Sequence, residues 1–67
     1  MIKVDSSCIN AVEYRNLESE LVVLFNSGDT YTYFGVPKTV YSGLIRSRSK
    51  GRYLNSKVKG KFEYRKV

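Results

Sequence analysis

Hydrophobic and polar residues follow one another in short runs along the first half of the chain, as is typical of β-strands. Residues 9–14 alternate imperfectly, residues 20–25 are rich in β-branched and aromatic side chains, and residues 30–34 alternate between threonine and an aromatic residue. Gly28, between the second and third runs, supplies the positive φ angle that a tight hairpin turn needs. Three strands joined by short turns predict an antiparallel meander.

The periodicity changes to helical spacing after Gly35-Val36-Pro37. A cluster of apolar residues predicts a short amphipathic helix over residues 38–46, with Pro37 in its first turn: Val40, Tyr41, Leu44 and Ile45. Gly43 lies inside this helix. Because a glycine there costs up to ~1 kcal/mol relative to alanine, we expect close packing at that position.

A second helix is predicted over residues 50–58, with Ser49 as its N-cap and Gly60 ending it. Residues 62–66 then form a last strand, with Phe62, Tyr64 and Lys66 on one face. The sequence therefore predicts one α+β domain over residues 1–67. Its element order is β-β-β-α-α-β, with a three-stranded meander and a C-terminal strand packed against two short helices.

The charge is concentrated in the last third of the chain. Residues 46–67 hold nine of the twelve basic residues and one of the six acidic residues, a net charge of +8, whereas residues 1–45 carry −2. A concentrated positive field favours a polyanion such as nucleic acid, or a phosphorylated small molecule. Aromatic residues inside this segment suit stacking on bases.

The residue counts disfavour catalysis and metal binding. The chain has no histidine, the usual general base near neutral pH, and its acidic residues are scattered. Cys8 is the only cysteine, so neither an intrachain disulfide nor a zinc site is expected, and a structural or surface role for this thiol is favoured. We expect no enzyme activity and no cofactor. The longest apolar run, five residues, is too short for a membrane helix, which predicts a cytoplasmic protein.

Three constellations are candidates for binding. Tyr31 and Tyr33 share a strand face and either stack bases or pack beneath the helices. The segment 49–55 combines a serine, a glycine and cations at a helix start, which suits a phosphate but also a plain N-cap with a solvated basic face. The candidate ligand-binding residues are Arg46, Arg48, Ser49, Lys50, Gly51, Arg52, Asn55, Lys57, Lys59 and Lys61, and the candidate stacking residues are Tyr31, Tyr33, Tyr41 and Tyr53. The alternating cations at 57, 59 and 61 either follow a phosphate backbone or only aid solubility.

Five motifs in order resemble the KTSC domain family, which is named for its occurrence at the C-terminus of some lysyl-tRNA synthetases and also occurs as free-standing small proteins of bacteria and phages. They are Ser6-Ser7-Cys8-Ile9, Tyr31-Thr32-Tyr33, Gly35-Val36-Pro37 with Val40-Tyr41, Ser49-Lys50-Gly51-Arg52-Tyr53-Leu54-Asn55, and Phe62-Glu63-Tyr64. The resemblance implies no catalytic residues, and it makes RNA a plausible ligand. The chain departs from the family pattern at Tyr53-Leu54, where phenylalanine is usual, and is more basic around Arg46-Ser47-Arg48.

These observations lead us to expect non-enzymatic binding of a polyanion, with RNA favoured. Two alternatives remain open at this point. One is binding or sequestration of a phosphorylated nucleotide at residues 49–55, and the other is an interaction module for an acidic protein. A cleft that encloses Ser49, Gly51 and Tyr41 would favour the nucleotide, and a flat basic face would favour RNA.

Overall fold

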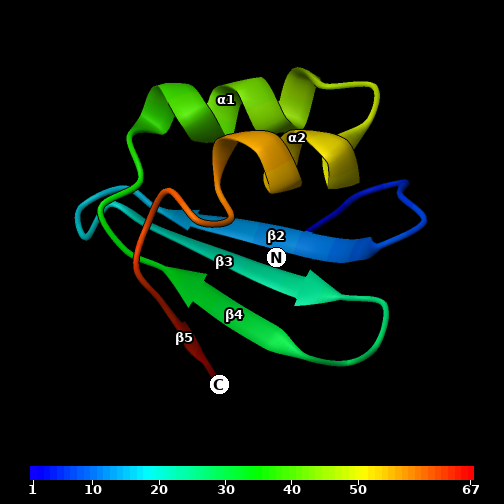
Figure 1. The fold of residues 1–67 in the computed structure, drawn as a ribbon, viewed down its shortest axis with the longest axis horizontal. Coiled ribbons are helices and arrows are strands. Elements are labelled where there is room, and N and C mark those ends of the chain that lie inside the picture. The colour runs from blue at the N-terminus through cyan, green and yellow to red at the C-terminus, as the bar shows by residue number, and fades with distance from the viewer.

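The computed structural model describes residues 1–67 as one antiparallel sheet with both helices on one of its faces (Figure 1). The five strands lie side by side in chain order: β1 (Ile2–Lys3), β2 (Ile9–Arg15), β3 (Glu20–Phe25), β4 (Thr30–Tyr33) and β5 (Tyr64–Lys66). The helices α1 (Lys38–Arg46) and α2 (Lys50–Lys57) connect β4 to β5. The predicted α+β class is confirmed, as are the meander and the C-terminal strand.

The structure corrects the sequence prediction at both edges of the sheet. The two-residue strand β1, which pairs Ile2 with Val12, was not predicted, because two residues are too few to show alternation. The last strand begins at Tyr64 and not at Phe62, which instead packs against the core ahead of the strand. Strand β4 ends one residue early, at Tyr33, because the chain turns at Gly35, whose φ angle is +67°.

A bulge in β2 explains the imperfect alternation there. The pairing register with β3 shifts between Ile9 and Ala11, so Ile9 and Val12 are both completely buried although they are three residues apart. In β3, Val23, which pairs with Val12, and Leu21, which pairs with Tyr14, are also completely buried.

The core lies between this sheet face and the helices. Its fully buried residues outside the sheet are Val36, Leu44, Leu54 and Val58. Helix α1 starts directly after Pro37, whose carbonyl accepts the backbone N–H of Val40 at 3.0 Å. Ser49 occupies the N-cap position of α2, as predicted, but its hydroxyl makes no capping hydrogen bond.

The close packing that the sequence predicted at Gly43 is a contact between the two helices. The hydroxyl of Tyr53 lies directly over Gly43 and donates a hydrogen bond to the carbonyl of Val40 at 2.9 Å. A Cβ atom at position 43 would overlap that hydroxyl and lie 2.8 Å from the Tyr53 Cζ. The ring of Tyr53 is therefore part of the packing between α1 and α2.

Candidate functional site

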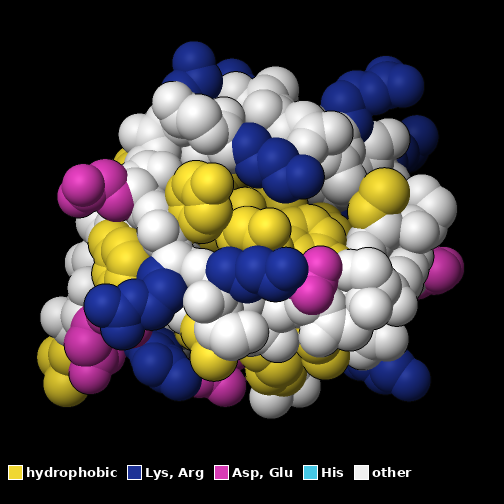
Figure 2. Space-filling view, turned by 60° about the horizontal axis from the view of Figure 1, so that its bottom comes forward, with side chains coloured by type: hydrophobic (Ala, Val, Ile, Leu, Met, Phe, Trp, Pro, Cys, Tyr) yellow, Lys and Arg dark blue, Asp and Glu magenta, His cyan; other side chains and the backbone are white.

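An open hollow of about 760 Å³ lies between the C-terminal end of α2 and the β3–β5 side of the sheet. Four aromatic rings line it, contributed by Phe25, Tyr31, Tyr33 and Tyr64. We call this the aromatic hollow. A space-filling view shows hydrophobic side chains at the bottom of a hollow that lies between cationic side chains (Figure 2). The volume is in the range that accommodates a small ligand or a nucleoside.

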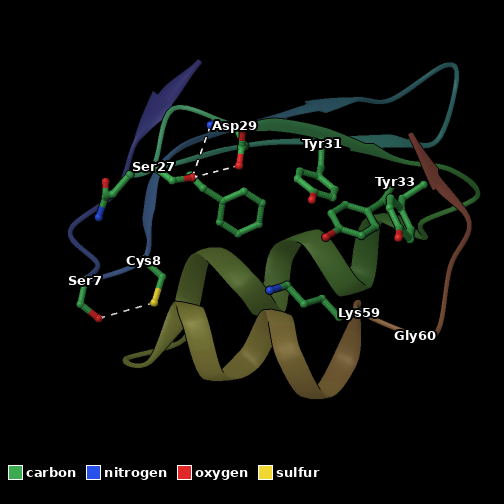
Figure 3. Close-up of a pocket in the computed structure, with 11 residues that line it drawn as sticks. Ser7, Cys8, Ser27, Asp29, Tyr31, Tyr33, Lys59 and Gly60 are labelled. Carbon is green, nitrogen blue, oxygen red and sulfur yellow. Dashed lines mark hydrogen bonds between the residues drawn. The ribbon is translucent and has the colours of Figure 1, made fainter. Parts of the chain in front are cut away.

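Strand pairing brings the four rings together. Tyr33 lies opposite Tyr64 across the β4–β5 pair, and their ring centroids are 5.8 Å apart. The ring centroid of Tyr31 is 5.5 Å from that of Tyr64. It is also 5.5 Å from the ring centroid of Phe25, and these two rings meet edge to face. The close-up shows Tyr31 and Tyr33 projecting from the sheet toward the helices (Figure 3).

The rings differ in how far a ligand can reach them. Tyr33 is only 2% exposed and belongs to the core, whereas Tyr64 is 59% exposed and Tyr31 is half-buried. Burial raises the pKa of Tyr33 above its ordinary value, and the neighbouring Tyr31 and Tyr64 raise it further. The prediction that Tyr33 stacks on a base is therefore opposed by its burial, while Tyr31 and Tyr64 present accessible rings.

Polar groups border the aromatic hollow at the β3–β4 turn. The carboxylate of Asp29 is 3.5 Å from the Lys66 ammonium and 3.4 Å from the Ser27 hydroxyl, which donates to it. On the helix side, the Lys59 ammonium lies 5.1 Å from the centre of the Phe25 ring, a cation–π contact (Figure 3). The lining of the hollow thus combines aromatic faces with one carboxylate, Asp29, and one cation, Lys59.

A second open hollow, of about 490 Å³, lies at the start of α2. We call it the basic hollow. It gathers six residues from the predicted phosphate-binding segment: Arg48, Ser49, Lys50, Gly51, Arg52 and Asn55. Its opposite wall is the loop from Asp5 to Cys8, so one acidic residue also lines it. The guanidinium groups belong to exposed residues, whereas the Lys50 ammonium donates a hydrogen bond to the Ser47 carbonyl at 2.7 Å.

The loop between β1 and β2 connects the two hollows. Ser7 and Cys8 line both of them, so the hollows form one continuous surface. The hydroxyl of Ser6 accepts the backbone N–H groups of Cys8 and Ile9, each at 3.2 Å, which fixes the turn. Cys8 is exposed, and its sulfur is 3.5 Å from the position that a Cβ atom on Gly51 would occupy. A side chain as small as alanine at position 51 would therefore make only an ordinary contact with this loop.

Five predicted site residues line neither of the two joined hollows. Tyr41 and Arg46 border a smaller hollow of about 410 Å³ on α1, where Tyr41 stacks on Tyr14 with 5.0 Å between ring centroids. Lys57 and Lys61 are exposed but line neither of the two joined hollows. Tyr53, a fifth, is occupied by the helix contact described above, which leaves it unavailable as a stacking platform.

Several residues of the aromatic hollow were not among the predicted site residues, chiefly Tyr64, Phe25 and Asp29. The signal for Tyr64 was present, because an aromatic-x-aromatic strand paired with Tyr31-Thr32-Tyr33 brings rings together on one face. No sequence signal placed the loop 5–8 beside the start of α2. The structure contains no cluster of three or more histidine, cysteine, aspartate or glutamate side chains that could hold a metal ion. Neither helix is long and apolar enough to span a membrane.

Comparison with known proteins gives consistent matches over nearly the whole chain. The sequence model of the KTSC domain matches residues 5–62. A lysine–tRNA ligase of Trichormus variabilis is 37% identical over all 67 residues, and one of Nostoc punctiforme is 34% identical. The chain spans only 12% of the length of these ligases.

Two further relatives are close to this chain in length. A protein of Tsukamurella paurometabola is 40% identical over 62 residues, which cover 92% of each chain. The crystal structure of a KTSC domain protein from Yersinia pestis superposes with a TM-score of 0.94 at 35% identity, covering 97% of this chain and 92% of that one. The chain therefore belongs to the KTSC domain family.

Proposed function

We propose that this protein is a non-enzymatic RNA-binding domain that holds a single strand along the two joined hollows. The observation that carries the proposal is their continuity at Ser7 and Cys8, which places accessible aromatic rings beside a cluster of cations. Proteins that bind single strands combine these same two elements, with rings that stack on bases and cations that follow the phosphates.

The distribution of charge supports a polyanionic ligand. Of the basic residues at the start of α2, Arg48 and Arg52 are exposed and form no ion pair in this structure, so both are free to contact phosphates. Arginine suits this role because its planar guanidinium donates several hydrogen bonds to phosphate oxygens. Three relatives are named lysine–tRNA ligases, and this supports RNA as the partner of the region in them that matches this chain.

A phosphorylated nucleotide is the second candidate, because both parts of the surface are concave. The basic hollow encloses Ser49 and Gly51, but Tyr41 lies elsewhere, so the ring that would complete a compact nucleotide site there is missing. This arrangement favours an extended strand over a single nucleotide.

The proposal is tested by fluorescence anisotropy with a labelled single-stranded RNA of about ten nucleotides at low salt. We expect Tyr64→Ala to weaken binding about fivefold or more, because stacking on one base is worth roughly 1–3 kcal/mol. Leu17→Ala is the matched control, since Leu17 is 94% exposed in a turn that lines neither hollow. Absence of RNA binding at low salt would overturn the proposal, and equally tight binding of nucleoside monophosphates would favour the second candidate.

A further inference from the structure

The aromatic hollow has a polar margin whose chemistry is selective among the bases. Asp29 immediately precedes β4 and Tyr31 is two residues farther on, so both side chains project from the same face of the sheet. The close-up shows Asp29, Tyr31 and Lys59 around one common space (Figure 3). A base that stacks on the Tyr31 or Tyr64 ring can therefore place one of its edges against the Asp29 carboxylate.

Among the four RNA bases, guanine is the one whose Watson–Crick edge presents two adjacent hydrogen-bond donors, N1–H and the N2 amino group. A carboxylate accepts both at once. Adenine and cytosine each offer one amino group next to an acceptor nitrogen, and uracil flanks its single N–H with two carbonyl oxygens. A carboxylate therefore binds the Watson–Crick edge of guanine more tightly than that of the other three bases, whose acceptor atoms it repels.

The surroundings of Asp29 allow a carboxylate to function next to a polyanion. Lys66, at 3.5 Å, partly compensates its negative charge, and the Ser27 hydroxyl donates to its second oxygen. The carboxyl group remains about half exposed, so its oxygens are open to a ligand. Lys59 adds a further positive charge across the hollow.

We infer that the aromatic hollow is a guanine-binding pocket, in which Tyr31 and Tyr64 hold the base and Asp29 reads its Watson–Crick edge. This inference rests on the proposed function and adds base selectivity to it. It predicts that the strand is positioned by the basic hollow and is selected by the base in the aromatic hollow.

The experiment compares four labelled decamers of uridine that carry guanine, adenine, inosine or no substitution at one central position. We expect wild-type protein to bind the guanine decamer about tenfold more tightly than the adenine decamer, which corresponds to about 1.4 kcal/mol. Inosine lacks the N2 amino group and should give an intermediate affinity. Asp29→Asn should abolish the preference, and its folding is checked by thermal unfolding.

The ratio of affinities, and not the affinity itself, is the informative quantity. Removal of one negative charge strengthens binding of every decamer alike, so Glu18→Gln, which makes the same charge change in the exposed β2–β3 turn, should leave the ratio unchanged. Equal binding of all four decamers, or a guanine preference that survives Asp29→Asn, would overturn the inference while leaving RNA binding intact. Failure of every decamer to bind would overturn both proposals.

Discussion

At the scale of single residues, Gly43 shows how one missing side chain determines the packing of the helix pair. Gly43→Ala gains up to ~1 kcal/mol in helix propensity. It also forces the Tyr53 ring to move, and overpacking of this kind costs roughly 1–3 kcal/mol. Loss of the Tyr53–Val40 hydrogen bond adds about 0.5–1.5 kcal/mol. We expect a net decrease of about 1–2 kcal/mol in the free energy of unfolding, measured by urea denaturation.

Gly51→Ala is the matched control for this substitution. A Cβ atom at position 51 would find its nearest neighbour, the Cys8 sulfur, at 3.5 Å, which is an ordinary contact. The stability of this variant should be unchanged or slightly raised. If Gly43→Ala were as stable as Gly51→Ala, the close contact between the helices at Gly43 would be refuted.

The burial of the Tyr33 side chain predicts how stability depends on alkaline pH. Because the pKa of Tyr33 is raised in the folded protein, the folded state retains its proton at pH values where the unfolded chain has lost it. The stabilisation is therefore fully present below about pH 10, the ordinary tyrosine value. It is lost as pH rises from there through the folded-state pKa.

Tyr33→Phe preserves the ring and removes the titrating group. Unfolding free energies between pH 8 and pH 11 should decline less steeply in this variant than in the wild-type protein, while other titrating groups contribute equally to both. Parallel curves would show that burial of Tyr33 does not disfavour its ionised form.

At the scale of elements, the connector between β4 and α1 is fixed by a tyrosine from β2. The Tyr14 hydroxyl donates to the Val36 carbonyl at 2.7 Å, and its ring stacks on Tyr41 of α1. Tyr14→Phe should lower the free energy of unfolding by about 1 kcal/mol, the usual net value of such a hydrogen bond. Its RNA affinity should not change, because this tyrosine pair lines neither hollow.

Thermal unfolding and anisotropy on the same Tyr14→Phe sample measure both quantities. A loss of RNA affinity in a variant that remains folded would place the Tyr14–Tyr41 pair at the interface and restore Tyr41 as a stacking residue.

Local patterns were sufficient to predict the longer elements, and long-range pairing explains what they missed. Residues 20–25 and 38–46 were predicted with the bounds that the structure shows. In both segments the spacing of the hydrophobic residues and the turn-forming residues at the ends indicate the same element. Strand β1 and the start of β5 depend on partners elsewhere in the chain. A hydrogen bond of 2.8 Å from the Phe34 N–H, just after β4, to the Glu63 carbonyl, just before β5, extends the pairing of these strands across 29 residues, and no local pattern specifies it.

At the scale of the whole molecule, folding divides the predicted basic segment between two surfaces. Arg48, Lys50 and Arg52 gather in the basic hollow, whereas Arg46 lies at the separate hollow on α1. The charge of the segment was evident from composition. Its division was not, because it depends on where the loop 5–8 and strand β5 lie relative to α2.

If the basic hollow contacts RNA phosphates, the salt dependence of RNA binding should change when its arginines are replaced. Anisotropy titrations of a single-stranded RNA at several salt concentrations would compare the wild type with Arg48→Gln/Arg52→Gln. Loss of two phosphate contacts should flatten the slope of log K against log salt by about 1.4, at roughly 0.7 for each contact.

The matched control is Lys3→Gln/Lys38→Gln, which removes the same charge from exposed residues that line neither hollow. We expect a flattened slope for the arginine variant and a slope close to that of the wild type for the lysine variant. Equal slopes in all three proteins, or equal flattening in both variants, would contradict a phosphate contact located at the basic hollow.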